Sequence, residues 1–160
     1  MRILVVDDNQ HMRDMVSTIL TSFGVGHVRA AGHGAQALSI LKNWPAHVAI
    51  IDYQMAPMDG LELTRQIRNR ETSPNAYLPI IMMTGYAERS RVIAARDAGV
   101  NEFLVKPITA KAVLDRLNAL ARRPREFVEA EHYFGPNRRR IFDLDHRGPR
   151  RRAEDAVAGA

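Results

Sequence analysis

The chain has 160 residues, of which 46% are hydrophobic, 26% are charged and 6% are aromatic. This length suits one domain with a short appendage, because a single domain usually takes about 100–200 residues. The absence of cysteine excludes a disulfide scaffold, a cysteine-ligated zinc site and a thiol nucleophile. The apolar run Ile3–Val6 is too short for a secretion signal, and no run approaches the roughly 18 apolar residues of a membrane span. We therefore expect a soluble, cytoplasmic protein.

The net charge of +5 is unevenly distributed along the chain. Residues 1–121 carry 13 Lys and Arg against 11 Asp and Glu, whereas residues 122–160 carry 10 Arg against 7 acids. Most of the basic excess therefore lies near the C-terminus. We divide the chain into a domain at residues 1–121 and an Arg-rich extension at residues 122–160.

The first part of the chain predicts two strand–helix units. The apolar run Ile3–Val6 predicts a buried strand, and a helix with Met and Leu residues at every third or fourth position follows it as far as Gly24. The weaker run His27–Ala30 predicts an edge strand, and a second helix ends at Pro45. The turn around Gly32–Gly34 matches no glycine motif for binding phosphate.

Three further strands are predicted, each followed by a helix. The strands are His47–Ile51, Leu78–Met83 and Glu102–Val105. The signals for the starts or ends of the helices are Asp59-Gly60, Gly99 and Thr109. The order βαβαβαβαβα predicts a doubly wound, five-stranded parallel sheet of the flavodoxin-like class. Folds of this class place their sites beyond the C-terminal ends of the strands.

Chemically active side chains directly follow four of the five strands. They are Asp7, Asp8, Asp52, Thr84 and Lys106. Three carboxylates at one sheet edge repel one another, and a hard divalent cation such as Mg²⁺ would relieve that repulsion. Lys106 can pair with a carboxylate or a phosphate oxygen, and Thr84 can donate a hydrogen bond to the same oxygen. Asp52 is the best candidate nucleophile toward phosphorus, because it stands alone after a central strand while Asp7 and Asp8 form a pair suited to a metal.

The motifs that contain these residues resemble the response-regulator receiver family of two-component signalling, which has the CheY-like fold. The resemblance covers residues 1 to about 121. It rests on Val5-Val6-Asp7-Asp8-Asn9, Ile51-Asp52, Met58-Asp59-Gly60-Leu61, Met83-Thr84-Gly85, Ala98-Gly99-Val100 and Lys106-Pro107-Ile108. It implies a bacterial phosphoprotein that is not an enzyme beyond its own phosphorylation and dephosphorylation.

The resemblance implies how the acidic residues divide the chemistry. Asp52 would accept a phosphoryl group from a histidine kinase or a phosphotransfer protein. Asp7, Asp8 and Asp52 would bind Mg²⁺, and the backbone carbonyl of Gln54 would complete the metal site.

The resemblance also implies a switch that responds to the phosphoryl group. Thr84 and Lys106 would contact that group, and the Lys106–Pro107 peptide bond would be cis. Phosphorylation would draw Thr84 inward and turn the ring of Phe103 with it. The surface formed by the fourth helix, fifth strand and fifth helix would then change and control a partner protein, since the added dianion biases a two-state element.

Two positions depart from the family pattern, and two others lie where the family varies the lifetime of the acyl phosphate. Ala56 stands where the family usually has proline, and Pro57 follows it, so the loop can turn differently. Phe103 has no hydroxyl group, so an outward state held by a tyrosine hydrogen bond is not available. Gln54 and Tyr86 occupy positions that tune the lifetime of the acyl phosphate in the family. Tyr86 could shield Asp52 from water or could simply cover the surface.

The extension after residue 122 lacks the three-helix core of a DNA-binding output domain. Its few apolar residues, among them Phe127 and Tyr133, are scattered among charges and Gly-Pro pairs, so we expect it to be disordered at least in part. Residues 133–140 could instead dock on the receiver or on a partner protein. The Arg triplets at 138–140 and 150–152 could contact nucleic-acid phosphates.

Three functional hypotheses follow. The leading one is a stand-alone response regulator, monomeric or dimerising on phosphorylation, that signals by protein contact. The alternative is a nucleic-acid-binding regulator whose receiver gates the basic tail. A metal-dependent phosphohydrolase of the haloacid-dehalogenase type is disfavoured, because that family needs Asp-x-Asp after the first strand and here the acids are adjacent. The six histidines have no metal-site spacing, although His11 could meet a kinase helix.

Overall fold

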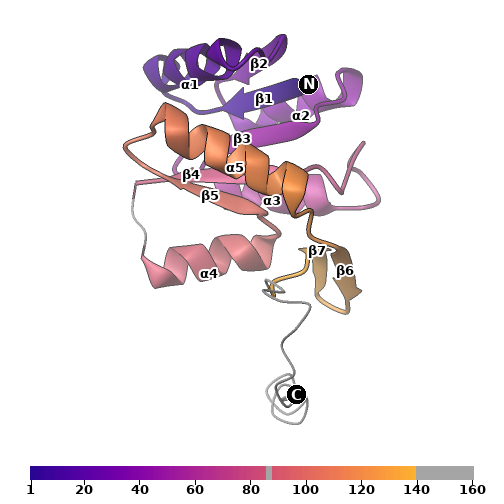
Figure 1. Cartoon of the computed structure of the whole chain (residues 1–160). Helices are drawn as coiled ribbons and strands as arrows, with labels where there is room; N and C mark the ends of the chain where they lie inside the picture. The colour runs from indigo at the N-terminus through magenta and orange to yellow at the C-terminus, as the bar shows by residue number, and fades with distance from the viewer. Residues whose placement is uncertain (86–87, 140–160) are drawn as a thin grey trace, which may run out of the picture.

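A five-stranded parallel sheet with the order β2-β1-β3-β4-β5 forms the centre of the molecule (Figure 1). Its strands are β1 (Arg2–Val6), β2 (His27–Ala31), β3 (Val48–Asp52), β4 (Ile80–Thr84) and β5 (Glu102–Val105). The computed structural model describes residues 1–85 and 88–139. The predicted doubly wound sheet is confirmed, and the weakly apolar second strand lies at the sheet edge as expected.

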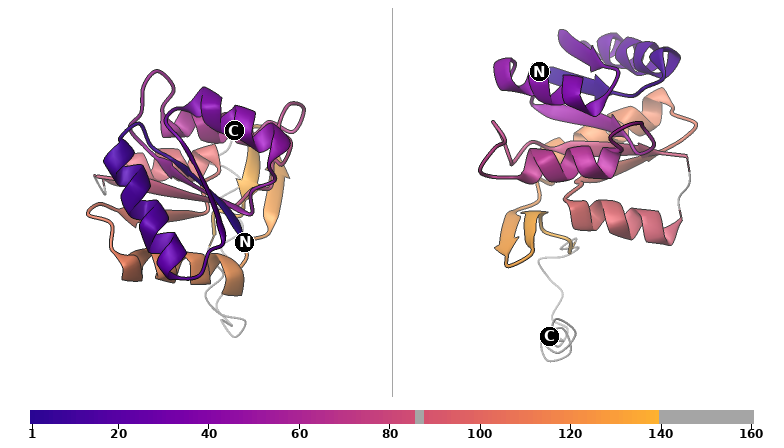
Figure 2. Two further views of the ribbon diagram at one scale, coloured as in Figure 1. Left: turned by 90° about the horizontal axis from the view of Figure 1, so that it is seen from above. Right: turned by 180° about the vertical axis from the view of Figure 1, so that it is seen from behind.

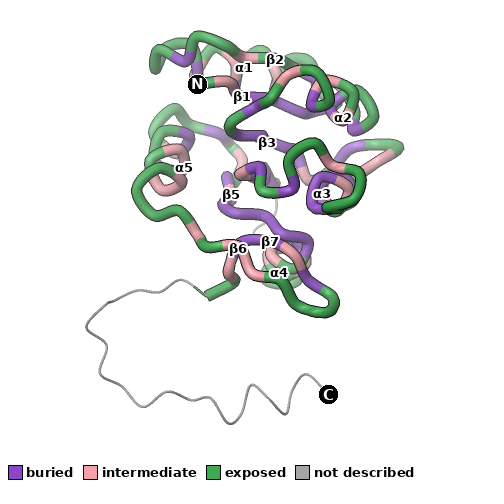
Figure 3. The backbone as a smooth tube through the Cα atoms, turned by 90° about the vertical axis from the view of Figure 1, so that its right-hand side faces the viewer, coloured by how far each residue is buried: buried purple, intermediate pink, exposed green. Residues whose placement is uncertain are grey.

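Helices cover both faces of this sheet (Figures 1 and 2). One face packs against α1 (Gln10–Ser22) and α5 (Ala110–Arg122), and the other packs against α2 (Gly34–Asn43), α3 (Gly60–Arg68) and α4 (Arg89–Ala98). Because side chains alternate along a strand, β1 sends Ile3 and Val5 to the first face and Leu4 and Val6 to the second. The central strands are therefore buried on both sides (Figure 3).

The helix boundaries follow from the local signals in the sequence. Asp59 caps α3 by accepting a hydrogen bond from the Glu62 amide at 2.8 Å, and Thr109 caps α5 by accepting one from the Ala112 amide at 3.2 Å. Gly99 ends α4 with a left-handed φ of 106°. All three predicted signals are confirmed.

Residues 127–136 form an antiparallel hairpin, which we call the C-terminal hairpin. Its strands are β6 (Phe127–Ala130) and β7 (Tyr133–Pro136), and Figure 1 shows it beside the end of α4. The expectation of disorder does not hold for these residues, because their aromatic side chains pack against one another and against Tyr77. Arg140 and the second Arg triplet lie outside the described residues.

No helix in the described part of the chain combines the length and the apolar character needed to cross a bilayer. The longest described helices, α1 and α5, have 13 residues each.

Candidate functional site

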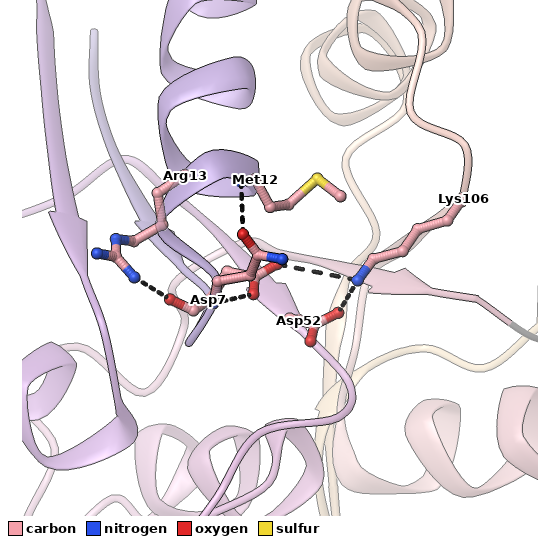
Figure 4. Close-up of polar contacts among 6 residues, drawn as sticks. Asp7, Met12, Arg13, Asp52 and Lys106 are labelled. Carbon is pink, nitrogen blue, oxygen red and sulfur yellow. Dashed lines mark hydrogen bonds and ion pairs between the residues drawn. The ribbon is translucent and has the colours of Figure 1, made fainter.

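The alternation of side chains along the strands brings three of the predicted site residues to one face of the sheet. Asp52 continues the face of Val48 and Ile50, which pack beneath α1 and α5. Asp7 and Lys106 follow β1 and β5 and reach the same side, so that their charged atoms meet at the C-terminal edge of the sheet (Figure 4). The position of each residue relative to the end of its strand therefore decides on which face of the sheet its side chain lies, and this matters as much as the residue type.

The three predicted carboxylates form one cluster. Asp7, Asp8 and Asp52 each offer an oxygen, and these oxygens all lie within 4.8 Å of one another. Asp7 and Asp52 are buried, with 1% and 4% of their surfaces exposed, whereas Asp8 is exposed to solvent. The cluster is thus open to solvent on the side of Asp8.

Asp7 is held in place by the chain around it. Its Oδ1 accepts a hydrogen bond from the Asn9 amide at 2.9 Å, and its backbone carbonyl accepts one from Nη1 of Arg13 at 2.8 Å (Figure 4). Its Oδ2 is buried without a hydrogen-bond partner among the described residues. A buried carboxylate oxygen left without a donor is costly, and a cation at this position would satisfy it.

Lys106 supplies the positive charge of the site. Its Nζ lies 2.8 Å from Oδ1 of Asp52 and 3.9 Å from Oδ2 of Asp7. The predicted pairing of this lysine with the site carboxylates is therefore present. Because the longer distance is an ionic contact and not a hydrogen bond, Lys106 compensates Asp52 more than Asp7.

The pKa values of the two buried carboxyl groups, Asp7 and Asp52, are raised because burial disfavours their charged forms. Burial raises the pKa of Asp7 to about 6, opposed by the hydrogen bond from the Asn9 amide and reinforced by the charge of Asp52. Burial also raises the pKa of Asp52, and the hydrogen bond and charge of Lys106 oppose that increase. Both carboxylates would gain from an added cation.

Thr84 and Phe103 lie on the opposite face from the carboxylates. Thr84 follows Ile80 and Met82 at alternate positions of β4, so it lies on the same face of the sheet as they do. Phe103 packs against the hydrophobic cluster that contains Ile80 and Met82, beneath α3 and α4. Thr84 is buried with 3% of its surface exposed, and its carbonyl accepts a hydrogen bond from the Lys106 amide at 2.9 Å. The two predicted switch positions therefore lie on the α3 and α4 face of the sheet, Thr84 at the end of β4 and Phe103 within β5.

The loop from β3 to α3 packs tightly against the end of β3. The Gly60 amide donates to the Tyr53 carbonyl at 2.9 Å, and a Cβ at Gly60 would collide with the Asp52 carbonyl oxygen. Gly60 is thus required by the close approach of two backbones beside Asp52.

The remaining predicted positions are distributed around this loop and the next one. Gln54 is exposed two residues after Asp52, and the metal-binding role of its carbonyl remains a prediction. The Ala56–Pro57 and Lys106–Pro107 peptide bonds are both cis, and the second confirms a prediction. Tyr86 lies outside the described residues, so its role also remains a prediction.

Some residues that shape the site were missed by sequence reasoning. Arg13 fixes the Asp7 carbonyl, and the guanidinium of Arg91 on α4 stacks over the Tyr53 ring at 5.4 Å. The position of Arg13 four residues after Asn9, one turn into a helix that begins at the acidic pair, is the signal that could have revealed the first contact. No sequence pattern links Tyr53 to Arg91, since that contact depends on how α4 packs.

Comparisons with known proteins all identify similarity to response-regulator receiver domains. A family model described as response regulator receiver domain matches residues 3–118. Chemotaxis protein CheY-3 of Vibrio cholerae is 36% identical over 123 residues, which are 77% of this chain and 93% of that protein. The chemotaxis protein CheY homolog of Campylobacter jejuni is 39% identical over 118 residues, which are 73% of this chain and 89% of that protein.

Solved structures give the same result for the fold. A putative response regulator from Chloroflexus aurantiacus superposes with a TM-score of 0.70 at 29% identity, covering 76% of this chain and 98% of that one. The chemotaxis protein CheY4 of Vibrio cholerae superposes with a TM-score of 0.68 at 28% identity, covering 73% of this chain and 95% of that one. The C-terminal hairpin lies beyond the residues that the family model matches.

Proposed function

Because the chain belongs to the response-regulator receiver family of two-component signalling, we propose that it is a stand-alone response regulator with Asp52 as its phosphoacceptor. The observation that carries the proposal is the meeting of Asp7, Asp8, Asp52 and Lys106 at one sheet edge. Its phosphodonor would be a histidine kinase or a phosphotransfer protein.

Asp52 would act as nucleophile in this reaction. One of its carboxylate oxygens forms a bond to phosphorus while the bond from phosphorus to the donor imidazole nitrogen breaks, and the electron pair leaves with the imidazole. Lys106, already 2.8 Å from Oδ1 of Asp52, would move its charge to an oxygen of the arriving phosphoryl group. Thr84 would donate a hydrogen bond to the same group.

The carboxylate cluster fits Mg²⁺. Asp7, Asp8 and Asp52 offer only oxygen atoms, Asp7 Oδ2 lacks a hydrogen-bond donor among the described residues, and exposed Asp8 leaves room for water ligands. A bound Mg²⁺ would neutralise charge on the phosphoryl oxygens. The carbonyl of Gln54 is proposed as the fourth protein ligand.

The output would pass through the surface formed by α4, β5 and α5. Thr84 and Phe103 lie beneath α4, so a shift of Thr84 toward a phosphoryl group would alter the packing there. This surface also exposes large apolar side chains on each of its three elements, namely Ile93, Val105 and Leu114. Exposed apolar side chains of this kind suit a protein partner.

The other elements of the proposal follow from this role. The protein would be cytoplasmic, would catalyse no reaction beyond its own phosphorylation and dephosphorylation, and would be a monomer or a phosphorylation-dependent dimer. Gln54 and Tyr86 would set the lifetime of the acyl phosphate. The alternative of nucleic-acid binding through the tail has no support from Arg138, because this residue pairs with Asp97 at 3.1 Å and stacks over Tyr133.

Incubation with acetyl phosphate tests the phosphoacceptor directly. In the presence of Mg²⁺ the intact mass of the protein should increase by one phosphoryl group, and EDTA should prevent the increase. Asp52→Asn should abolish it, while Asp59→Asn, which changes an exposed helix cap in the same loop, should leave it in place. An unchanged mass of the wild-type protein would refute the proposal.

A further inference from the structure

The C-terminal hairpin is attached to the end of α4 that lies farthest from the phosphorylation site. Nη1 of Arg138 pairs with Oδ1 of Asp97 at 3.1 Å, and the same guanidinium stacks over the Tyr133 ring at 4.0 Å. Gly135 packs against Gly99, the residue that ends α4, so closely that an added Cβ would lie 3.1 Å from the Gly99 Cα. The hairpin therefore contacts both the last turn of α4 and its C-cap.

The same hairpin is anchored to α3 and to the loop before β4. The rings of Phe127, Phe134 and Tyr77 form a cluster with centroid distances of 5.0 to 5.5 Å. Arg70, just after α3, pairs with Glu129 at 2.7 Å and stacks over the Phe134 ring at 5.1 Å. Aromatic pairs and stacked cations of this kind add stability beyond the buried area.

Arg68, the last residue of α3, connects the hairpin to the C-cap of α4. Its guanidinium donates to the Gly99 carbonyl at 3.0 and 2.8 Å and lies 5.0 Å from the centre of the Phe127 ring. Burial lowers the pKa of Arg68 to about 10, which leaves it charged at neutral pH. The hairpin thus closes a cluster in which the end of α4 is held from two sides.

The other end of α4 is differently placed. Its N-terminus follows the loop that leaves β4 after Thr84, and its first turn reaches the site through the stacking of Arg91 over Tyr53. A helix held at its C-terminal end and facing a reacting site at its N-terminal end can respond to that site by tilting about the held end.

We propose that the C-terminal hairpin is a clamp on α4 that sets how readily the receiver adopts its phosphorylated state. The inference rests on the proposed function, in which α4 moves when Asp52 is modified. The clamp contacts exist in the arrangement where Lys106 pairs with unmodified Asp52. Because a tilt of α4 would strain the contacts at its held end, these contacts are more favourable in the unmodified state, and loosening them should favour the phosphorylated one by linkage.

Two matched pairs of variants separate the clamp from general destabilisation. Gly135→Ala places a Cβ 2.7 Å from the Tyr133 hydroxyl oxygen and 3.1 Å from the Gly99 Cα, so it disturbs β7 where the hairpin meets α4. Gly26→Ala is its control, because an added Cβ at Gly26 meets no atom within 4 Å. Arg138→Ala removes the ion pair with Asp97, and its control, Lys42→Ala, removes an exposed cation on α2. Arg138→Ala leaves the core intact, so it remains informative if Gly135→Ala unfolds.

Hydrogen exchange measures whether the hairpin holds α4. The amides of Gly99 and Val100 donate to Arg96 and Ala95 and close the C-terminus of the helix. We expect these amides to exchange about tenfold faster in the two clamp variants and at the wild-type rate in the controls. Equal exchange in all four variants would overturn the clamp, whatever the protein does with phosphate.

Titration with beryllofluoride and Mg²⁺, followed by ¹⁹F NMR, measures the effect on the switch. The clamp variants should bind beryllofluoride about fivefold tighter than wild type, and the controls should bind it as wild type does. Faster exchange without tighter binding would overturn the regulatory effect and leave the proposed function standing. Failure of the wild-type protein to bind beryllofluoride would instead contradict the proposed function and with it the regulatory effect.

Discussion

Asp7 combines deep burial with an oxygen that has no hydrogen-bond donor, and this combination distinguishes it from the neighbouring acid. Asp8 is exposed and is hydrated by solvent, whereas only 1% of the surface of Asp7 is exposed and its Oδ2 has no hydrogen-bond donor among the described residues. Asp7 therefore costs folding energy when it is ionised. A bound cation would offset this unfavourable free energy, so the site favours cation binding.

Replacement of Asp7 by asparagine should stabilise the metal-free protein. Burial raises the pKa of Asp7 from 3.8 to about 6, so the folded state binds the proton more tightly than the unfolded state. This contribution to stability is complete below the unfolded value and is lost as the pH rises through the folded value. At pH 8 in EDTA, Asp7→Asn should raise the free energy of unfolding by about 1–3 kcal/mol, and the gain should shrink toward pH 4.

Urea unfolding at several pH values checks this prediction. Asn at position 7 keeps an oxygen that can accept the hydrogen bond from the Asn9 amide, so the comparison isolates the charge. Asp8→Asn, which removes an exposed carboxylate, should give a smaller gain. A stability difference between Asp7→Asn and wild type that is constant from pH 4 to pH 8 would contradict the burial argument.

Mg²⁺ should stabilise the wild-type protein through the same cluster. A cation that binds only the folded state stabilises it by an amount that grows with the logarithm of the cation concentration relative to its Kd, and the melting temperature rises accordingly. Asp8→Asn removes one ligand without disturbing the core, and we expect it to weaken Mg²⁺ binding about tenfold or more. Thermal melting across a Mg²⁺ titration measures the effect, and superimposable titrations for variant and wild type would exclude Asp8 as a ligand.

Residue types and strand ends were sufficient to predict these site residues. Asp7, Asp52 and Lys106 each directly follow, or end, an apolar run, and parallel strands bring such positions together. The burial difference between Asp7 and Asp8 could not be predicted, because it depends on how the chain turns after β1. The bond from Arg13 to the Asp7 carbonyl, in contrast, could have been inferred from the position of Arg13 one turn into the first helix.

Among the elements, α3 shows how one side chain can organise several chain segments. Arg68 donates to the carbonyls of Gly99, Ala76 and Leu78 and to Oδ1 of Asn101, at 2.7 to 3.0 Å. It thus joins the end of α3 to the segments that precede β4 and β5. Periodicity could not reveal this role, because an Arg on a helix is usually exposed.

Arg68→Ala should destabilise the protein strongly. The change removes a donor from four buried acceptors, of which Oδ1 of Asn101 keeps the Ile80 amide, and we expect a loss of about 3–5 kcal/mol in the free energy of unfolding. Arg65→Ala is the matched control in the same helix, because Arg65 is exposed and makes one long ionic contact, 3.9 Å, with exposed Glu62. The loss in the free energy of unfolding for this variant should stay below about 1 kcal/mol. Equal losses for the two variants in urea unfolding would show that the Arg68 network contributes nothing of its own.

The C-terminal hairpin was the element that sequence reasoning did not predict. Its two-residue turn, Glu131-His132, lacks the Asn-Gly or Asp-Gly pair that usually marks a tight hairpin. Its aromatic residues are stabilised by Tyr77 and Arg70, which are distant in sequence. The five strands and helices of the receiver, in contrast, have local apolar runs and caps, and those signals predicted their order correctly.

For the whole molecule, the charge sum gives little information about mechanism. The net charge of +5 arises largely near the C-terminus, yet the chemistry depends on three acids and one lysine at the other end of the sheet from the hairpin. The hairpin and the site meet the two ends of α4. In the clamp that we propose, this arrangement would let a segment outside the family match influence the proposed switch inside it.

The location of the phosphoryl group tests the central proposal most directly. After incubation with acetyl phosphate and Mg²⁺, borohydride reduction converts an acyl phosphate into an alcohol, and peptide mass mapping identifies the modified residue. We predict a single reduced residue, Asp52, in protein that received Mg²⁺ and none in protein treated with EDTA. Modification at any other residue, or labelling that does not depend on Mg²⁺, would contradict the account.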